Sequence, residues 1–295
     1  MYIEGPLKSG KSAFLVEKFI ELVESGILTS EILVITLNSY KKNVFSEKIR
    51  AKLADLQING IGELPVYTFN GIVYNSIKAN WSLVEELIPE NRGKREIIPN
   101  LCGLEVSELF IKSCIKKINK REKLEDSLRD YKSHKSLKHQ ILRRHSLIAN
   151  NFLDQDEIID RSEILEEPMG KIAQEVLEEL RKSANNYRCF DQYKQISTFF
   201  YLVDSGKIDF GRIKYLLVDD FDETTYSAQY FINKLIPKVK EFFIAVDTEG
   251  SSRRGYLCAN PCGYEEIKSS NPSEIVNLTS EKTSYNDAQS YLIQS

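Results

Sequence analysis

The sequence lacks the long hydrophobic runs that mark membrane proteins. None of its apolar stretches approaches the roughly 20 residues that a helix needs to cross a bilayer. Internal repeats and low-complexity tracts are also missing, which excludes repeat architectures. The first residues read as a short strand and a polar loop rather than a signal peptide, so we expect a cytoplasmic protein with no membrane partner.

Cysteine is scarce and irregularly spaced. The chain has five cysteines, an odd number, and most of them stand far apart in the sequence. This usage favours reduced thiols in the cytosol over a disulfide framework. Cys258 and Cys262 form a C-x-x-x-C pattern, but no further ligands accompany them, so we do not expect a metal or cluster site there.

The overall composition is that of an ordinary soluble protein, with 42% hydrophobic and 28% charged residues in 295. This length suits one large domain or two ordinary ones. The net charge of −3 conceals a strong asymmetry. From Lys112 to Arg144 there are twelve basic and four acidic residues, whereas from Asp154 to Lys182 there are ten acidic and four basic ones.

Strand and helix patterns alternate at both ends of the chain. The helix expected directly after the first loop carries Phe14, Leu15, Phe19, Ile20 and Val23 at helical spacing. Alternating strands and helices predict an α/β fold with a parallel sheet. The expected strands are the first five residues, Glu31–Leu37, Leu64–Phe69, Lys214–Phe221 and Glu241–Val246.

The middle of the chain differs from its ends. Between about Asn70 and Ser197 no strong strand pattern occurs, and the sequence is charged, rich in Leu and Ile, and helical in period. We therefore predict one α/β domain over residues 1–85 and 195–295, interrupted by a helical subdomain over residues 86–194. The last 25 or so residues are polar and weakly patterned.

A phosphate-binding pattern lies at the start of the chain. Gly5 to Ser12 fit G-x-x-x-x-G-K-[ST] between a predicted strand and an amphipathic helix. In such a loop, backbone N–H groups surround a phosphate, the lysine reaches the β- and γ-phosphates, and the serine ligates Mg²⁺. A chance match in a turn rich in Gly, Ser and Lys is the alternative. The expected ATP-binding residues are Gly5, Pro6, Ser9, Gly10, Lys11 and Ser12.

An acidic motif far along the chain complements this loop. Tyr215–Val218 predict a buried strand, and Asp219 and Asp220 follow at its carboxyl end, where open α/β sheets bind ligands. We expect Asp219 to bind Mg²⁺ through water and Asp220 to orient or deprotonate the attacking water, with Lys11 as the second catalytic residue. The loop and the acidic motif are expected to meet across adjacent strands.

These motifs resemble those of the UvrD/Rep/RecB-type superfamily 1 DNA helicases. The family string D-E-F-Q-D-T corresponds to Asp219 through Thr224. The resemblance implies a RecA-like P-loop NTPase domain that uses ATP and Mg²⁺ and translocates along single-stranded or duplex DNA. It also implies a second RecA-like domain, in cis or in a partner subunit, that supplies an arginine finger. The start at the P-loop resembles the AddB-type subunits.

Further segments follow the family's order and imply further roles. The implied DNA-binding residues are Thr36 and Asn38 in one segment and Thr68, Phe69 and Asn70 in the next. A later segment implies that Asp247 and Arg254 couple ATP hydrolysis to movement, and Cys189–Ile196 resembles the segment before the acidic strand.

The chain also departs from the family pattern. The base position holds Asp220 instead of Glu, Asp222 replaces a Gln, and Gln229 lies one residue out of register with a later Gln. The Gln that senses the γ-phosphate after Asp247 is missing. An isolated motor half is expected to hydrolyse ATP weakly or not at all, because the arginine finger contributes about 10³–10⁵ in rate.

Two other functions stay open at this point. One is a non-hydrolysing, helicase-like DNA-binding subunit of a recombination or repair nuclease. The other, which the acidic string and the helical insertion disfavour, is a P-loop kinase. The basic block is either a DNA-contacting face or a solvated helix face with acidic partners between Asp154 and Glu179, and its three histidines are expected at the surface. Its members are Lys116, Lys117, Lys120, Arg121, Lys132, Lys135, Lys138, Arg143 and Arg144, with His134, His139 and His145.

Overall fold

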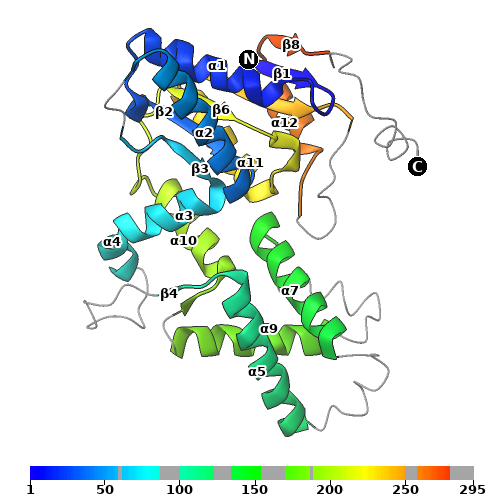
Figure 1. Cartoon of the computed structure of the whole chain (residues 1–295). Helices are drawn as coiled ribbons and strands as arrows, with labels where there is room; N and C mark the ends of the chain where they lie inside the picture. The colour runs from blue at the N-terminus through cyan, green and yellow to red at the C-terminus, as the bar shows by residue number, and fades with distance from the viewer. Residues whose placement is uncertain are drawn as a thin grey trace. The chain divides into compact units, whose positions relative to one another are not determined.

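The computed structural model describes residues 1–58, 62–86, 100–122, 134–153, 170–186, 189–249 and 258–279. The chain divides into two compact units (Figure 1). The first, here called the sheet unit, comprises Met1–Phe69, Phe210–Thr224 and Gln229–Ser295. The second, the helical unit, comprises Asn70–Asp209 and Thr225–Ala228.

A six-stranded sheet in the order β3-β2-β6-β7-β1-β8 forms the centre of the sheet unit, and all neighbouring strands run parallel. This sheet, flanked by helices, confirms the predicted α/β fold of the RecA-like P-loop type. Its strands are β1 (Tyr2–Gly5), β2 (Ile32–Thr36), β3 (Val66–Thr68), β6 (Tyr215–Val218), β7 (Glu241–Asp247) and β8 (Ile275–Asn277).

The central strands are hydrophobic throughout because the sheet is covered on both faces. All five residues of β2 and all four of β6 are buried, the pattern of parallel strands between two helical layers. Ile35 of β2 pairs with Val218 of β6, which pairs in turn with Ile244 of β7. The carboxyl ends of these strands therefore lie side by side, and we call this side of the sheet the carboxyl edge.

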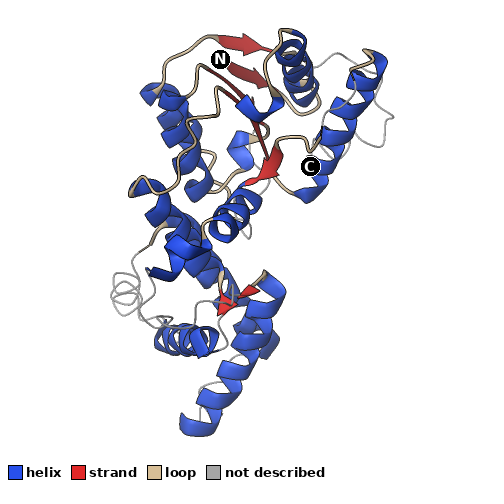
Figure 2. Cartoon of the chain, turned by 90° about the vertical axis from the view of Figure 1, so that its left-hand side faces the viewer, coloured by secondary structure: helices blue, strands red, loops and turns tan. Residues whose placement is uncertain are grey.

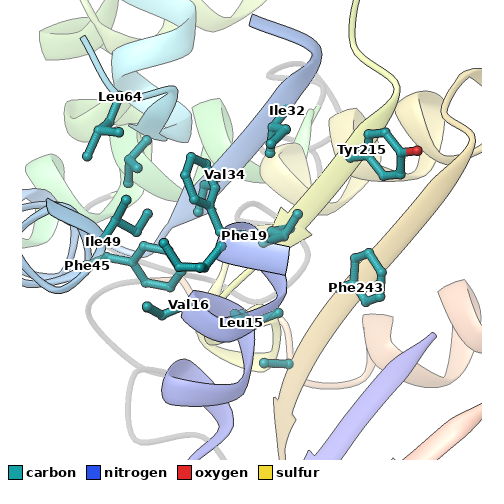
Figure 3. Packing of buried hydrophobic residues seen from close by; sticks show 14 of the residues in the cluster. Leu15, Val16, Phe19, Ile32, Val34, Phe45, Ile49, Leu64, Tyr215 and Phe243 are labelled. Carbon is teal, nitrogen blue, oxygen red and sulfur yellow. The ribbon is translucent and has the colours of Figure 1, made fainter. Parts of the chain in front are cut away.

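Helices α1 and α2 cover one face of the sheet. Leu15 and Phe19 of α1 and Phe45 and Ile49 of α2 repeat at helical spacing and are at most 3% exposed. They form one cluster with strand side chains such as Val34 (Figure 3). The helices of this unit are α1 (Lys11–Glu24), α2 (Ser39–Asp55), most of α11 (Tyr226–Leu235), whose first residues through Ala228 belong to the helical unit, and α12 (Gly263–Ser270). Single turns lie at Thr29–Glu31, Phe221–Glu223 and Ile236–Lys238.

The opposite face of the sheet receives α12 beside β1. Tyr2 points away from the α1 and α2 cluster, because successive side chains of a strand alternate between faces. Its hydroxyl donates to Asn271 O at 2.8 Å, and its ring meets that of Tyr264 edge-on at a centroid distance of 5.6 Å. The weakly patterned stretch near the end of the chain adds β8 to the sheet, with Ile275 opposite Tyr2.

The helical unit has its own core, in which α5, α7 and α9 pack together. Ile111, Ile118, Ile141, Val176 and Leu180 are among its buried residues, each at most 2% exposed.

Within the described part of the chain, no helix is both long and apolar enough to cross a membrane. Figure 2 shows the strands in red among the blue helices. The elements are α3 (Phe69–Ala79), α4 (Trp81–Glu86), α5 (Leu104–Glu122), α7 (His134–Asn151), α9 (Gly170–Asn186) and α10 (Gln192–Asp204), with the two-residue strands β4 (Asn100–Leu101) and β5 (Cys189–Phe190).

The prediction of surface histidines is wrong for His145. This residue is 1% exposed, and its Nε2 lies 3.9 Å from Asp191 Oδ2. Burial lowers the pKa of His145, against the opposing charge of Asp191, so the imidazole is neutral at neutral pH. The sequence shows a charged block around this residue, but helical spacing turns His145 inward with its neighbour Ile148. His139 is exposed, and the side chain of His134 lies outside the described residues.

Candidate active site

The predicted phosphate loop joins β1 to α1 in a left-handed turn. Lys8 and Gly10 have φ angles of 64° and 91°, and Ser9 N–H donates to Pro6 O at 3.2 Å. Gly5 is packed so closely that a Cβ there would lie 2.5 Å from Ser9 Oγ. Ser9 Oγ itself is buried with no hydrogen-bond partner among the described residues. A buried donor without a partner is costly, so this hydroxyl fits a site that receives an acceptor from a ligand.

Lys11, the first residue of α1, is folded back into this loop. It is 8% exposed, and its Nζ donates to Gly5 O at 2.7 Å and to Pro6 O at 2.6 Å. The same Nζ lies 3.4 Å from Asp247 Oδ2, at the end of β7. The ammonium group is therefore held by the loop carbonyls and one carboxylate, beside the loop's backbone N–H groups.

Ser12 brings the loop into contact with the acidic motif. Its Oγ lies 2.9 Å from Asp219 Oδ1 and 3.0 Å from Oδ2. Asp219 is 2% exposed; burial raises its pKa to about 6, and the Asp220 charge adds to the rise, while Ser12 and Lys41 oppose it. The structure thus brings together two residues that are 207 positions apart in the sequence.

The expectation that the two motifs meet across adjacent strands is wrong. β7 lies between β1, which carries the loop, and β6, which carries Asp219. The motifs still meet because α1 packs against both β6 and β7, so its first turn spans the intervening strand. The order of strands in a sheet is set by packing between distant segments, which local sequence patterns do not encode.

Asp220 adopts a left-handed backbone conformation, with φ 51° and ψ 49°. Its Oδ2 lies 3.1 Å from Lys41 Nζ, in the first turn of α2. Burial lowers the pKa of Lys41, but the Asp220 charge and hydrogen bond outweigh it, so the net pKa is raised. Sequence reasoning missed Lys41, although its place just after β2 at the carboxyl edge is a signal that could have found it.

Asp222 and Asp247 connect β6 to β7 at the same edge. Asp247 N–H donates to Asp222 Oδ1 at 2.9 Å, and Asp222 is 3% exposed. Burial raises the pKa of Asp222 to about 6, partly offset by the backbone hydrogen bonds. Arg254, the other residue predicted to act in coupling, lies outside the described residues.

The segments predicted to contact DNA have mixed exposure. Thr36 is 1% exposed and its hydroxyl donates to Tyr67 O at 3.4 Å, while Asn38 caps α2 by accepting Lys41 N–H at 2.9 Å. Phe69 is 8% exposed and its ring lies 6.1 Å from that of Phe231. Thr68, at the end of β3, is half-buried, whereas Asn38 and Asn70 are exposed.

Gln229, the residue one position out of register, is engaged within the protein. Its Nε2 donates to Asn260 O and its Oε1 accepts from Asn260 Nδ2, both at 2.7 Å. It also donates to Phe221 O at 3.2 Å. Through these hydrogen bonds of its side-chain amide, Gln229 links the segment before α12 to the turn after β6.

Part of the basic block is paired with acidic residues inside the helical unit. Lys117 forms an ion pair with Glu179, and Lys138 forms one with Glu108. Lys116 and Arg143 are exposed. Lys132 lies outside the described residues, as do the side chains of Lys120, Arg121 and Lys135.

A known protein family matches the segments that make these contacts. The family model for the UvrD/REP helicase N-terminal domain matches residues 8–251, which include Lys11, Ser12, Asp219 and Asp247. The match also spans the helical unit between the two halves of the sheet. No curated protein matches the chain significantly.

Proposed function

The chain belongs to the UvrD/REP helicase N-terminal domain family, and on this premise we propose that it is the ATP- and Mg²⁺-binding half of a superfamily 1 DNA helicase. In this proposal a second RecA-like domain, in cis or from a partner subunit, completes the motor. Hydrolysis of ATP then drives movement along single-stranded or duplex DNA. The observation that carries the proposal is the direct contact of Ser12 with buried Asp219.

The donor set at this contact fits magnesium. A hydroxyl and a carboxylate are the hard oxygen ligands that Mg²⁺ prefers, and this ion usually takes only one or two carboxylates and completes its shell with water and phosphate. Within the described part of the chain, no group of three His, Cys, Asp or Glu residues gathers to form an all-protein metal cage. Ser12 and Asp219 would hold the ion, which would neutralise charge on the bound phosphates.

The phosphate loop supplies the groups that bind the nucleotide. Lys11 Nζ would exchange its carbonyl contacts with Gly5 and Pro6 for phosphate oxygens. The unpartnered hydroxyl of Ser9 would donate to a phosphate, assisted by the N-terminus of α1. Asp220 would accept the proton of the attacking water, and its carboxylate is one methylene shorter than the Glu of the family string.

The remaining site residues are proposed to contact DNA and to transmit the state of the nucleotide. Asn38, Thr68 and Asn70 are accessible enough to touch a strand, whereas Phe69 is too buried to stack on a base without moving. We assign coupling to Asp247, which contacts Lys11, together with Arg254. DNA repair is the general setting in which such motors work.

The binding proposal is tested by titrating a fluorescent ATP analogue in the presence of Mg²⁺. Lys11→Ala is expected to weaken binding at least tenfold, because it removes a charge-assisted phosphate contact. The control Lys48→Ala removes the same charge from an exposed position on α2 and is expected to change nothing. Equal, negligible nucleotide binding by the wild type and Lys11→Ala would refute the motor proposal. If the wild type then still bound DNA in a salt-dependent way, this result would support the non-hydrolysing DNA-binding subunit.

A further inference from the structure

Lys41 forms an ion pair with Asp220 and comes from outside the phosphate loop. It lies in the first turn of α2, and its Nζ is 3.1 Å from Asp220 Oδ2. The two side chains are 40% and 20% exposed, so the pair lies partly sheltered at the carboxyl edge. The same ammonium group also acts electrostatically on Asp219.

The conformation of Asp220 makes this contact important. The left-handed backbone at φ 51° leads into the turn Phe221–Glu223, and the Asp220 side chain makes no capping hydrogen bond to that turn. Its carboxylate is therefore not fixed by the local backbone. The partner that restrains it comes from α2, which is distant in the sequence.

Lys41 is itself held in place by the helix cap. Asn38 Oδ1 accepts the backbone N–H of Lys41 at 2.9 Å, which fixes the start of α2 just after β2. The next residue behaves differently, because Lys42 Nζ lies over the ring of Tyr67, 5.5 Å from its centroid. Two consecutive lysines of one helix thus have different surroundings, and only the first is paired with an acid of the site.

We propose that Lys41 is a positioning residue that holds Asp220 for attack by water and sets the charge of the carboxylate pair that receives magnesium. The inference rests on the proposed function and adds to it a residue from α2 that links the Asn38 segment to the nucleotide site. Two opposite effects follow. Removing the Lys41 charge strengthens magnesium binding, because a negative charge is left unbalanced, and slows hydrolysis, because Asp220 loses its restraint.

Four proteins test the proposal: the wild type, Lys41→Met, Asp220→Asn and the double variant, which differ in the charge at the site. Asp219, Asp220 and Lys41 together carry one negative charge, which Lys41→Met raises to two and Asp220→Asn lowers to none. The double variant restores a single negative charge. Lys41→Met is therefore expected to bind magnesium most tightly and Asp220→Asn most weakly. The wild type and the double variant should have equal affinities between these two, with steps of about tenfold.

The experiment measures two quantities on each protein as the full chain. Magnesium affinity comes from the Mg²⁺ dependence of fluorescent ADP binding, and the rate of hydrolysis comes from single-turnover reactions with protein in excess over ATP. Lys41→Met is expected to lower the single-turnover rate about tenfold, and Lys41→Arg to restore most of it. Lys42→Met is the matched control, since it removes the same charge one residue away.

The outcomes separate this inference from the proposed function. Binding of Mg²⁺ and nucleotide by the wild type, with equal magnesium affinities in Lys41→Met and Lys42→Met, would overturn the role of Lys41 alone. A rate loss from Lys41→Met that persists unchanged in the Asp220→Asn background would also overturn it. If the wild-type rate is too slow to measure, the order of magnesium affinities decides. Absence of any nucleotide binding by the wild type would overturn both proposals.

Discussion

Replacement of Asp222 by Asn gives a direct test of the electrostatics at the carboxyl edge. Asp222 Oδ1 accepts the backbone N–H of Asp247 at 2.9 Å, and a side-chain amide oxygen can accept the same bond. The other oxygen, Oδ2, is buried without a hydrogen-bond partner in the described part of the chain. The substitution therefore keeps the shape and the one hydrogen bond and removes the buried charge.

The sign of the effect follows from the pKa of Asp222, which burial raises from 3.8 to about 6. Between these values the folded chain retains a proton that the unfolded chain has lost. The contribution of Asp222 to stability is thus complete below pH of about 4 and is lost as the pH rises through about 6. Because one pKa unit corresponds to about 1.4 kcal/mol, the full loss amounts to about 3 kcal/mol at most.

The assay compares free energies of unfolding in urea, followed by circular dichroism, for the wild type and Asp222→Asn. The difference between the two proteins is expected to grow by about 2–3 kcal/mol in favour of the variant between pH of about 4 and 7. Any fixed cost of the new amide cancels in this comparison. Asp55→Asn, at the exposed end of α2, controls for the loss of one negative charge. A difference that does not vary with pH would refute the reasoning.

Three further outcomes are expected. Gly5→Ala places a Cβ 2.5 Å from Ser9 Oγ, so it should lower stability by about 1–3 kcal/mol, measured by thermal unfolding, and weaken nucleotide binding. Phe69→Ala should cost about 3–5 kcal/mol in urea unfolding, because the ring is buried; a loss of DNA affinity at full stability would contradict this. Lys117→Ala should change stability by less than about 1 kcal/mol, since its ion pair with Glu179 is exposed on the lysine side. If the same variant altered the salt dependence of DNA affinity, this result would show that Lys117 contacts a phosphate.

The sequence was sufficient to predict the strands of the sheet where burial dominates. The predicted strand Glu31–Leu37 contains β2 (Ile32–Thr36), and Glu241–Val246 agrees with β7 (Glu241–Asp247) to within one residue. In both segments β-branched and aromatic side chains are buried on two faces, so the pattern is continuous and strong. β8 could not be found in this way, because it is only three residues long and, at the edge of the sheet, its residues remain exposed or half-buried.

The candidate site was predictable in its residue types but not in its pairings. The spacing of Gly5, Gly10 and Lys11 is local, and a loop between a strand and a helix can be recognised from it. The contact between Lys41 and Asp220 depends on how α2 meets the end of β6, which no local pattern encodes. For the same reason, only the structure shows that β7 lies between β1 and β6. Only the structure shows that His145 is buried.

The first turns of α1 and α2 carry a further argument for a site that receives an anion. Helix dipoles favour acidic residues at N-termini, yet neither helix has an acid in its first turn, and both have a lysine there, Lys11 and Lys41. Each lysine costs some helix stability, about 0.3–1 kcal/mol, at a position where Asp or Glu would add to it. The facing carboxylates, Asp247 and Asp220, offset this cost in the structure. The sequence thus departs from local helix preference twice, after β1 and after β2, at the carboxyl ends of two strands of the same parallel sheet. The proposed nucleotide site accounts for both departures, because a phosphate can accept from backbone N–H groups and from lysines.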